Sequence, residues 1–415
     1  MPQKNFLFVP FGSHGDVHPI IGLAVAMKAR GHKVAVVTNG YFRTLVEKNQ
    51  LEYVELGTEQ EYLEATTNPL LWDAREGSRV VMAYVSKTFR PAYQLLLQRW
   101  QREKYTLVSS PLCMSARVLQ ETHKVPLITT QLQPLVLRTV HEVPGMPLMP
   151  SWAPSWWIRL FYWLADAAFV DPIICPGLNA FRQELGLPPV KRVMQSWWNS
   201  PQRVIGLWPA WFAAPQIDWP PQAKLAGFPL YDESSIGTLS PELEAFLAAG
   251  SAPIAFTPGS AMRQGREFFE SAIGACEKLQ RRGLLLTRFA ENIPPNLPAS
   301  VLHVPYAPFG QLLPRCAALV HHGGIGTMAQ GFAAGIVQLV MPMAHDQPDN
   351  LLRLRRLGAG DGLAPESFKA SAVAEKLQAL LTDTRVQTRC RELQVLIRAA
   401  QPLATACELL EAELV

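Results

Sequence analysis

The chain carries one strand–loop–helix pattern twice, and this repetition limits the folds open to it. Near the beginning, the apolar run Phe6–Pro10 is followed by a loop with glycines, a helical run and a second apolar run, Val34–Thr38. The pattern starts again at Ile254–Thr257, where a Pro-Gly-Ser turn leads into a predicted helix near Glu267–Arg282. Alternating strands and helices are typical of parallel sheets. The sequence therefore predicts an α/β protein with two doubly wound, Rossmann-like domains that face each other across a cleft.

The length of 415 residues fits two such domains better than a single core. We expect an N-terminal domain over residues 1–215 and a C-terminal domain over residues 236–398. The segment 216–235, which is rich in proline and aromatic residues, is the predicted linker. We expect residues 399–415 to form a helix that packs back on the N-terminal domain.

Charge and cysteine usage exclude several classes of protein. The formal net charge is only +4 and no run of like charges occurs, so the sequence gives no electrostatic case for nucleic-acid binding. The six cysteines are scattered without paired spacing, which predicts reduced thiols rather than disulfides or a zinc site. The first apolar run is too short for a signal peptide, and we therefore expect a cytoplasmic protein.

The strongest chemical motif is VHHGGIGTMAQGFAAG at Val320–Gly335. A predicted strand ends at two histidines, a glycine-rich turn follows, and Thr327 stands at the beginning of a helix. Such a turn directs backbone N–H groups and the positive end of a helix dipole at one point, which suits an anionic diphosphate. Glycines also allow phosphates to approach the backbone closely.

Two flanking segments give this motif its meaning: PYAPFGQLLP at Pro305–Pro314 and PMAHDQPDN at Pro342–Asn350. Together the three segments resemble the donor-binding motif of family 1 glycosyltransferases, which have the GT-B fold. The resemblance extends over the whole chain and implies a nucleotide-sugar donor bound to the C-terminal half. It assigns the donor site to Ser260, Tyr306, His322, Gly324, Gly326, Thr327, Asp346 and Gln347. His321 lies beside the matching position, and we expect it to be structural.

The resemblance also implies a role for each donor-site residue. His322 and the loop that follows it match the diphosphate contacts, and Ser260 matches a second phosphate contact. Tyr306 stands where the family often has a tryptophan that stacks on the nucleobase. Asp346 and Gln347 match the residues that hold the sugar hydroxyls.

Glycosyl transfer needs a base for the acceptor hydroxyl, and the loop Gly12–Pro19 offers one. This loop, GSHGDVHP, resembles the G-S-x-G-D-x-x-P loop of bacterial and sterol family members, and Asp16 stands where plant enzymes place their catalytic histidine. His14 and His18 are alternative bases, because imidazole titrates nearer to pH 7. Asp16 could instead cap a helix that starts near Pro19.

We expect the transfer to need no metal ion and no cofactor besides the nucleotide sugar. The sequence contains no Asp-x-Asp motif, and the His322 loop with its helix can neutralise a diphosphate. By resemblance to the family, the anomeric centre inverts.

The stretch Val190–Asp232 is similar to the rhamnosyltransferases of rhamnolipid synthesis. This likeness implies dTDP-rhamnose as the donor and a hydroxyalkanoyloxy-alkanoate as the acceptor, in the synthesis of a glycolipid biosurfactant. Alternatives remain open: a UDP-glucose-dependent enzyme that makes glucolipids, an enzyme that acts on a sterol or polyketide, a nucleotide-sugar epimerase, or a non-catalytic partner of another enzyme.

Ten of the eleven tryptophans lie between Trp100 and Trp219, so the N-terminal half carries a large aromatic surface. We expect Trp152, Trp156 and Phe161 to bind a hydrophobic acceptor, although core packing would also explain such rings. Charged residues interrupt this apolar region, so it is not a predicted membrane span. Contact with the inner-membrane surface, or with an enzyme that makes the acceptor, is a further hypothesis.

Overall fold

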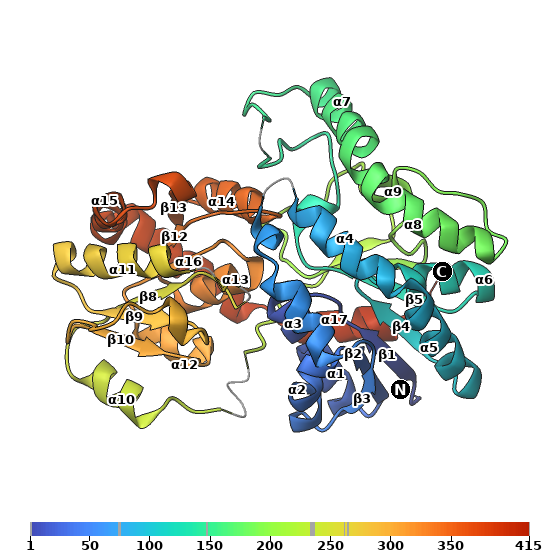
Figure 1. The fold of residues 1–415 in the computed structure, drawn as a ribbon, viewed down its shortest axis with the longest axis horizontal. Coiled ribbons are helices and arrows are strands. Elements are labelled where there is room, and N and C mark those ends of the chain that lie inside the picture. The colour runs from blue at the N-terminus through green and yellow to red at the C-terminus, as the bar shows by residue number, and fades with distance from the viewer. Residues whose placement is uncertain are drawn as a thin grey trace. The chain divides into compact units, whose positions relative to one another are not determined.

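The structure is a computed structural model with two compact units, each described by itself below (Figure 1). The N-terminal unit comprises residues 1–12, 16–229 and 401–415, and the C-terminal unit comprises residues 13–15 and 230–400. The structure describes residues 2–73, 76–146, 148–232, 237–260, 262–263 and 265–414.

The N-terminal unit is built on a parallel sheet of seven strands in the order β3-β2-β1-β4-β5-β6-β7. The central strands arise from apolar runs that are buried almost completely, as expected when helices cover both faces. The strands are β1 (Asn5–Val9), β2 (Lys33–Thr38), β3 (Glu52–Glu55), β4 (Thr106–Ser109), β5 (Leu127–Gln131), β6 (Arg203–Gly206) and β7 (Ala223–Leu225).

Ten α-helices of the described residues accompany this sheet. They are α1 (His14–Ala29), α2 (Arg43–Lys48), α3 (Glu59–Thr67), α4 (Gly77–Lys87), α5 (Phe89–Arg102), α6 (Met114–His123), α7 (Ser155–Ala165), α8 (Asp171–Glu184), α9 (Val193–Ser196) and α17 (Pro402–Glu411). A π-helical turn, η4 (Asp166–Val170), joins α7 to α8. Within the part of the chain that the structure describes, no helix is both long and apolar enough to cross a membrane.

The predicted linker over residues 216–235 is wrong in part, because β7 lies inside it and pairs in parallel with β6. The strand escapes prediction because it has only three residues and none of them is buried. Trp208 and Trp219, which precede β7, are buried in the N-terminal unit and do not belong to an exposed linker. Trp208 is fully buried and its ring lies 5.9 Å from that of Trp219.

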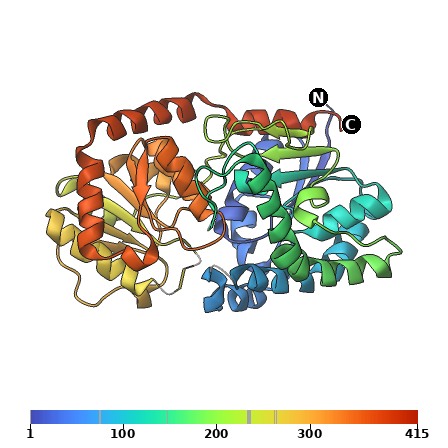
Figure 2. The ribbon, with the colours of Figure 1, turned by 90° about the horizontal axis from the view of Figure 1, so that it is seen from above.

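The last helix, α17, belongs to the N-terminal unit, and Figure 2 shows it in red beside the blue and green elements of that unit. The buried carboxylate of Glu411 accepts hydrogen bonds of 2.7 Å from both Nε and Nη2 of Arg30 and lies 2.9 Å from His32 Nε2. These bonds, with Arg30 first, lower the pKa of Glu411 to about 2. Arg203 binds the end of the same helix through the carbonyl of Leu409. These contacts connect α17 to the N-terminal unit.

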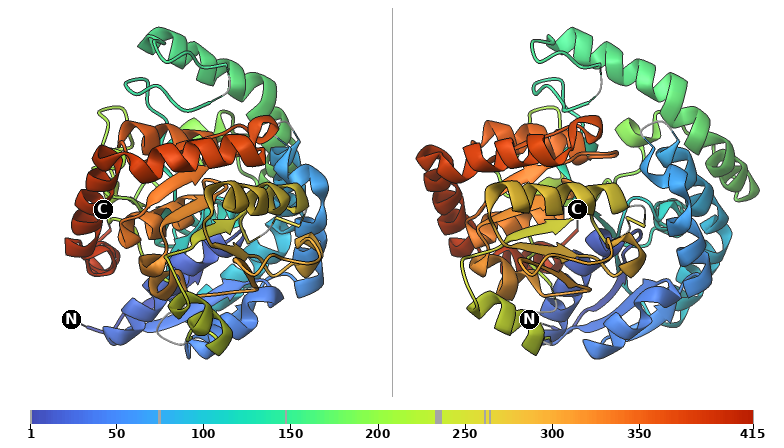
Figure 3. Two further views of the ribbon diagram at one scale, coloured as in Figure 1. Left: turned by 90° about the vertical axis from the view of Figure 1, so that its left-hand side faces the viewer. Right: turned by 60° about the vertical axis from the view of Figure 1, so that its left-hand side comes forward.

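The C-terminal unit is built on a second parallel sheet, in the order β10-β9-β8-β11-β12-β13. Its strands are β8 (Ile254–Thr257), β9 (Gly283–Leu286), β10 (Val301–Val304), β11 (Ala318–His321), β12 (Val337–Val340) and β13 (Gly360–Gly362). Its helices are α10 (Pro241–Ala248), α11 (Arg266–Leu279), α12 (Phe309–Leu312), α13 (Ile325–Ala334), α14 (Gln347–Arg356), α15 (Ala370–Thr382) and α16 (Thr384–Ala399). Figure 3 shows these helices around the sheet.

The register of the second sheet decides which loops meet. β8 and β11 pair in parallel, with Thr257 opposite His321 at their last residues. The loop after β8 and the turn after β11 therefore leave the sheet at the same edge. In doubly wound sheets this carboxyl edge is where ligands bind. The predicted α/β class with two Rossmann-like domains is confirmed.

Candidate functional site

The turn between β11 and α13 is shaped for a close-approaching ligand. Gly323 has φ +93°, and a Cβ at this position would lie 2.8 Å from Cγ1 of Val340. Gly324 is the N-cap residue of α13 and offers no side chain to cap the helix. A Cβ on Gly326 would have nothing within 4 Å, and Thr327 is only partly buried. The first turn of α13 thus presents amides and a hydroxyl, as predicted for a diphosphate site.

The ring of His322 fits between two loops only because both contribute a glycine. A Cβ on Gly259 would lie 3.0 Å from Nε2 of His322, and one on Gly324 would lie 2.5 Å from the same atom. Among the described residues, Nδ1 of His322 has no hydrogen-bond partner. Burial lowers the pKa of His322 to about 4, so the ring is neutral at pH 7 and keeps one N–H to donate. The contribution of Gly259 escaped the sequence analysis.

The side chain of His321 is fully buried, and both of its ring nitrogens have hydrogen-bond partners there. Its Nδ1 accepts a hydrogen bond of 3.1 Å from the backbone N–H of Gly323, and its Nε2 lies 3.0 Å from Oε1 of Gln338. This geometry requires a neutral ring protonated at Nε2. Burial, followed by the neighbouring His322, lowers the pKa of His321 to about 3. His321 therefore holds the glycine turn in place, in line with the structural role expected for it.

Gln347, at the beginning of α14, also supports its own loop. Its Oε1 accepts hydrogen bonds of 2.7 Å from the N–H of Met343 and 3.2 Å from that of Ala344. The residue is 3% exposed. The structure thus shows a loop-holding role for the carbonyl oxygen of a residue that was predicted to hold sugar hydroxyls.

Asp346 is tied to the glycine turn through one neighbour. Asn350 Nδ2 donates hydrogen bonds of 2.6 Å to Oδ2 of Asp346 and 2.9 Å to the carbonyl of Gly323. Burial raises the pKa of the Asp346 carboxyl above its ordinary value. The segment after β12 and the turn after β11 are therefore held together, and this brings Asp346 to the same edge of the sheet as His322.

Tyr306 and Ser260 lie on the two remaining loops of this edge. Tyr306 is 42% exposed, and its hydroxyl donates a hydrogen bond of 2.9 Å to the carbonyl of Asp232. The guanidinium of Arg288 lies over its ring, 5.3 Å from the centroid. Ser260 is exposed and directly follows Gly259, which touches His322. All eight predicted donor residues thus belong to the loops and helix starts that follow β8, β10, β11 and β12.

In the N-terminal unit, the helix that carries Asp16 begins earlier than predicted. α1 starts at His14, so Asp16 lies in its first turn rather than at an N-cap before Pro19, which is inside the helix. The interpretation of Asp16 as a helix cap is therefore wrong. Gly12 has φ +130°, and its missing side chain leaves the space that the carboxylate of Asp16 occupies.

The two alternative bases lie on a different side of the same helix. His14 and His18 are four residues apart, which places them on one face of α1, whereas Asp16 is two residues from each and points away from that face. All three residues are partly buried. A ligand group that contacts Asp16 therefore meets a different face of α1 from one that contacts His14 or His18.

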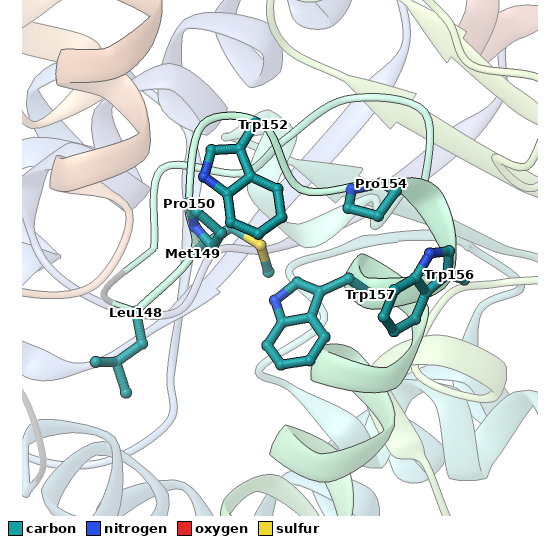
Figure 4. Close-up of a pocket in the computed structure, with 7 residues that line it drawn as sticks. All are labelled: Leu148, Met149, Pro150, Trp152, Pro154, Trp156 and Trp157. Atoms are coloured by element: carbon teal, nitrogen blue, oxygen red, sulfur yellow. The ribbon is translucent and has the colours of Figure 1, made fainter.

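A pocket of about 570 Å³ lies between α7 and the loop that precedes it (Figure 4). Seven side chains line it, and none of them is charged: Leu148, Met149, Pro150, Trp152, Pro154, Trp156 and Trp157. The pocket includes Trp152 and Trp156 from the predicted acceptor set. Phe161 does not line it and instead packs beside the small core of Ala153, Ile158 and Tyr162.

A buried ion pair holds the helix of this pocket in place. Asp166, in the π-helical turn after α7, is 1% exposed and accepts a hydrogen bond of 2.6 Å from Nη1 of Arg138. Arg192 lies 3.4 Å from its other oxygen. The guanidinium of Arg138 also lies 4.8 Å from the ring centroid of Tyr162. These contacts fix the end of α7 and leave its tryptophans exposed.

Comparisons with known proteins match both halves of the chain. Residues 6–142 match the glycosyltransferase family 28 N-terminal domain, and residues 286–408 match the C-terminal domain of erythromycin biosynthesis protein CIII-like proteins. The O-mycaminosyltylonolide 6-deoxyallosyltransferase of Streptomyces fradiae is 30% identical over 422 residues, with 96% of this chain and 95% of that protein covered. A sterol 3-beta-glucosyltransferase of Vanderwaltozyma polyspora is 26% identical, and the match spans 35% of its length.

Solved structures share the fold over nearly the whole chain. The glycotransferase of kitacinnamycin superposes with a TM-score of 0.77 at 19% identity and 99% coverage of both chains. The spinosyn rhamnosyltransferase SpnG complexed with thymidine diphosphate superposes with a TM-score of 0.70 at 18% identity, covering 98% of this chain and 100% of that one. With the sequence relatives and the two matching domain families, these likenesses show that the chain belongs to the family 1 glycosyltransferases of GT-B fold.

Proposed function

We propose that the protein transfers rhamnose from dTDP-rhamnose to the hydroxyl of a hydroxyalkanoyloxy-alkanoate, and so makes a glycolipid biosurfactant. The observation that carries this proposal is the uncharged tryptophan pocket in the N-terminal unit, because it offers an amphiphile an apolar surface. The glycosyltransferase family supplies the reaction, and the pocket supplies the acceptor class.

The donor belongs on the carboxyl edge of the second sheet. The free amides at the start of α13 and the neutral ring of His322 suit the diphosphate. The exposed ring of Tyr306 suits the nucleobase, and Asp346 suits a sugar hydroxyl. These groups bind the leaving nucleotide and stabilise the charge that grows on it as the glycosidic bond breaks.

Asp16 is the proposed base. It takes the proton of the acceptor hydroxyl while that oxygen forms a bond to the anomeric carbon and the carbon–phosphate oxygen bond breaks. Direct displacement of this kind inverts the anomeric centre and releases dTDP. A carboxylate suffices, because the attacking hydroxyl becomes more acidic as its bond to an oxocarbenium-like carbon forms.

Rhamnose is proposed over glucose because rhamnose is a 6-deoxyhexose and the names of two similar proteins refer to sugars of this class. A relative that is 30% identical over 422 residues is named for the transfer of a 6-deoxyallosyl group, and a solved structure of the same fold is named a rhamnosyltransferase. The likeness of Val190–Asp232 to rhamnolipid rhamnosyltransferases points the same way. A second candidate is a UDP-glucose-dependent enzyme, which the sterol 3-beta-glucosyltransferase relatives favour.

The test is a competition between donors in the presence of EDTA. The purified protein is incubated with a hydroxyalkanoyloxy-alkanoate and equimolar dTDP-rhamnose and UDP-glucose, and mass spectrometry identifies the product. We expect a rhamnosylated lipid, and EDTA should not lower its yield, because the proposed mechanism needs no metal ion. A glucosylated lipid would favour the second candidate. Donor consumed without a glycolipid would favour an epimerase or hydrolysis.

A matched pair of tryptophan variants tests the acceptor side. Trp156→Ala removes a ring from the pocket, whereas Trp163→Ala removes an exposed ring from the same helix outside the pocket. Loss of a large apolar contact should raise the KM for the lipid about 10-fold in Trp156→Ala. The KM for the donor should stay unchanged, and Trp163→Ala should behave as wild type. Equal effects of both substitutions would argue against the pocket as the acceptor site.

Two exposed apolar side chains outside the pocket support a proposed contact with the membrane in which such an acceptor dissolves. Leu164 and Phe169 are 49% and 62% exposed. Leucine and phenylalanine side chains on the apolar face of a helix can insert into the membrane–water interface. Liposome flotation tests this contact, and absence of the protein from the lipid fraction would dismiss it.

A further inference from the structure

Arg263, in the loop between β8 and α11, has no acidic partner among the described residues. The residue is partly buried, and its Nε atom is buried without a hydrogen-bond partner in the described part of the chain. The guanidinium lies 4.7 Å from the ring centroid of Phe289. A buried donor without a partner costs free energy, and an anionic ligand would satisfy this N–H together with the charge beside it.

A second unused donor lies close to the same loop. Asn292 is 4% exposed, and its Nδ2 has no partner among the described residues. This nitrogen would lie 3.6 Å from a Cβ on Gly265, the N-cap residue of α11. Among the described residues, no side chain caps this helix of 14 residues. An uncapped helix start and a buried amide donor thus accompany the unpaired arginine.

The geometry of the sheet brings this loop to the His322 turn. Gly259 packs against the His322 ring, and the N–H of Met262 donates a hydrogen bond of 3.3 Å to the carbonyl of Gly259. This hydrogen bond holds Met262 close to Gly259, and Arg263 is the next residue along the chain. Arg263 and His322 therefore follow two paired strands, β8 and β11, and each has a nitrogen without a partner.

We propose that Arg263, supported by Asn292, binds the diphosphate of the nucleotide sugar. The inference rests on the proposed function, because it concerns the same donor. His322 is neutral at pH 7 and offers only a dipole, whereas the guanidinium is always charged and can bind two phosphate oxygens at once. Arg263 thus supplies the positive charge that the leaving diphosphate needs, and the stacking on Phe289 orients it.

Isothermal titration calorimetry with thymidine, dTDP and inorganic pyrophosphate tests this assignment. The variants are Arg263→Gln and the control Arg266→Gln, which removes the same charge from an exposed arginine whose side chain binds the carbonyl of Glu291. We expect Arg263→Gln to weaken dTDP binding about 10- to 100-fold, as for a lost charge-assisted hydrogen bond. Thymidine should bind both variants as it binds wild type, and Arg266→Gln should keep its dTDP affinity within about threefold.

A second variant, Asn292→Ala, keeps the test valid if Arg263→Gln does not fold. We expect it to lose about 3- to 10-fold in dTDP affinity with unchanged thymidine binding. Unchanged dTDP affinity in a folded Arg263→Gln protein would overturn the inference and leave the donor assignment standing. Loss of pyrophosphate binding alone would show an anion site unrelated to the nucleotide. Failure of wild type to bind dTDP would overturn the inference together with the proposed donor.

Discussion

The loop before α1 and the turn before α13 both use glycine to make room for a functional side chain, but the two side chains differ in chemistry. Each follows an internal strand of its sheet, β1 or β11, and each relies on glycine to make room for one side chain. In the first loop Gly12 makes room for the carboxylate of Asp16, which can accept a proton. In the second, Gly259 and Gly324 make room for His322, which is neutral and can donate a hydrogen bond.

The difference between them lies in where the space comes from. Gly12 is one helical turn before Asp16, so the space is local to one loop. Part of the space for His322 comes from Gly259, which reaches it because β8 pairs with β11. The first loop can therefore be disturbed by a local change without affecting the second sheet. Substitutions at the glycines should separate turnover from donor binding.

Among the glycine substitutions, the largest effect is expected from Gly12→Ala. A Cβ at φ +130° is strained, and it would overlap the carboxylate of Asp16. Displacement of a catalytic group by about 1 Å costs on the order of 100-fold in rate, so kcat should fall by about that factor. Calorimetry should give an unchanged Kd for dTDP. The control is Gly177→Ala in α8, where a Cβ meets only ordinary contacts of 3.6 and 3.7 Å.

Gly324→Ala should show the converse pattern. The new Cβ would meet Nε2 of His322 at 2.5 Å and force the ring away from the helix start. Loss of the hydrogen bond and of the close phosphate approach should weaken dTDP binding about 10- to 30-fold. Thymidine affinity should change little. A variant that binds dTDP as wild type does would show that the position of the His322 ring is unimportant.

A smaller effect concerns the pH dependence of stability. Because the pKa of His321 is about 3 in the folded protein and about 6.5 in an unfolded chain, the unfolded chain binds its proton first as the pH falls. The stability due to the neutral ring is therefore complete above pH 6.5 and is lost progressively toward pH 3. Between pH 7.5 and 5.5 the loss should be about 1.4 kcal/mol.

Urea unfolding of wild type and His321→Gln at these two pH values measures this contribution. The pH-dependent loss should be smaller in the variant by about 1.4 kcal/mol, whatever its absolute stability. Equal losses in both proteins would show that His321 does not remain neutral in the folded state.

Apolar runs and the loops next to them could be predicted from the sequence. Strands such as β8 and β11 coincide with the predicted ranges, because a buried central strand is a short continuous apolar run. The edge strands β3 and β7 could not be predicted from the sequence. β3 is polar and β7 has only three residues, so neither shows the apolar run of a buried strand. The start of α1 was placed too late because Pro19, a common first residue of helices, lies inside this one.

The proposed donor site shows the same limit at the level of single residues. His322 follows from a local motif, whereas the contact of Gly259 with its ring depends on strand pairing. That Nε of Arg263 has no partner among the described residues depends on what surrounds it in the fold. Gln347 was assigned by position, but its carbonyl oxygen binds its own loop. In the aromatic region, the sequence could not distinguish Trp156, in the pocket, from the fully buried Trp208.

The most direct test of the division between the two loops is the turnover of Asp16→Asn, measured with dTDP-rhamnose and the lipid acceptor. Asparagine keeps the shape of the side chain but cannot take a proton. The account predicts that kcat falls by about 10²- to 10⁴-fold while the Kd for dTDP stays within about threefold. Turnover near that of wild type, with activity lost instead in His14→Ala or His18→Ala, would contradict it.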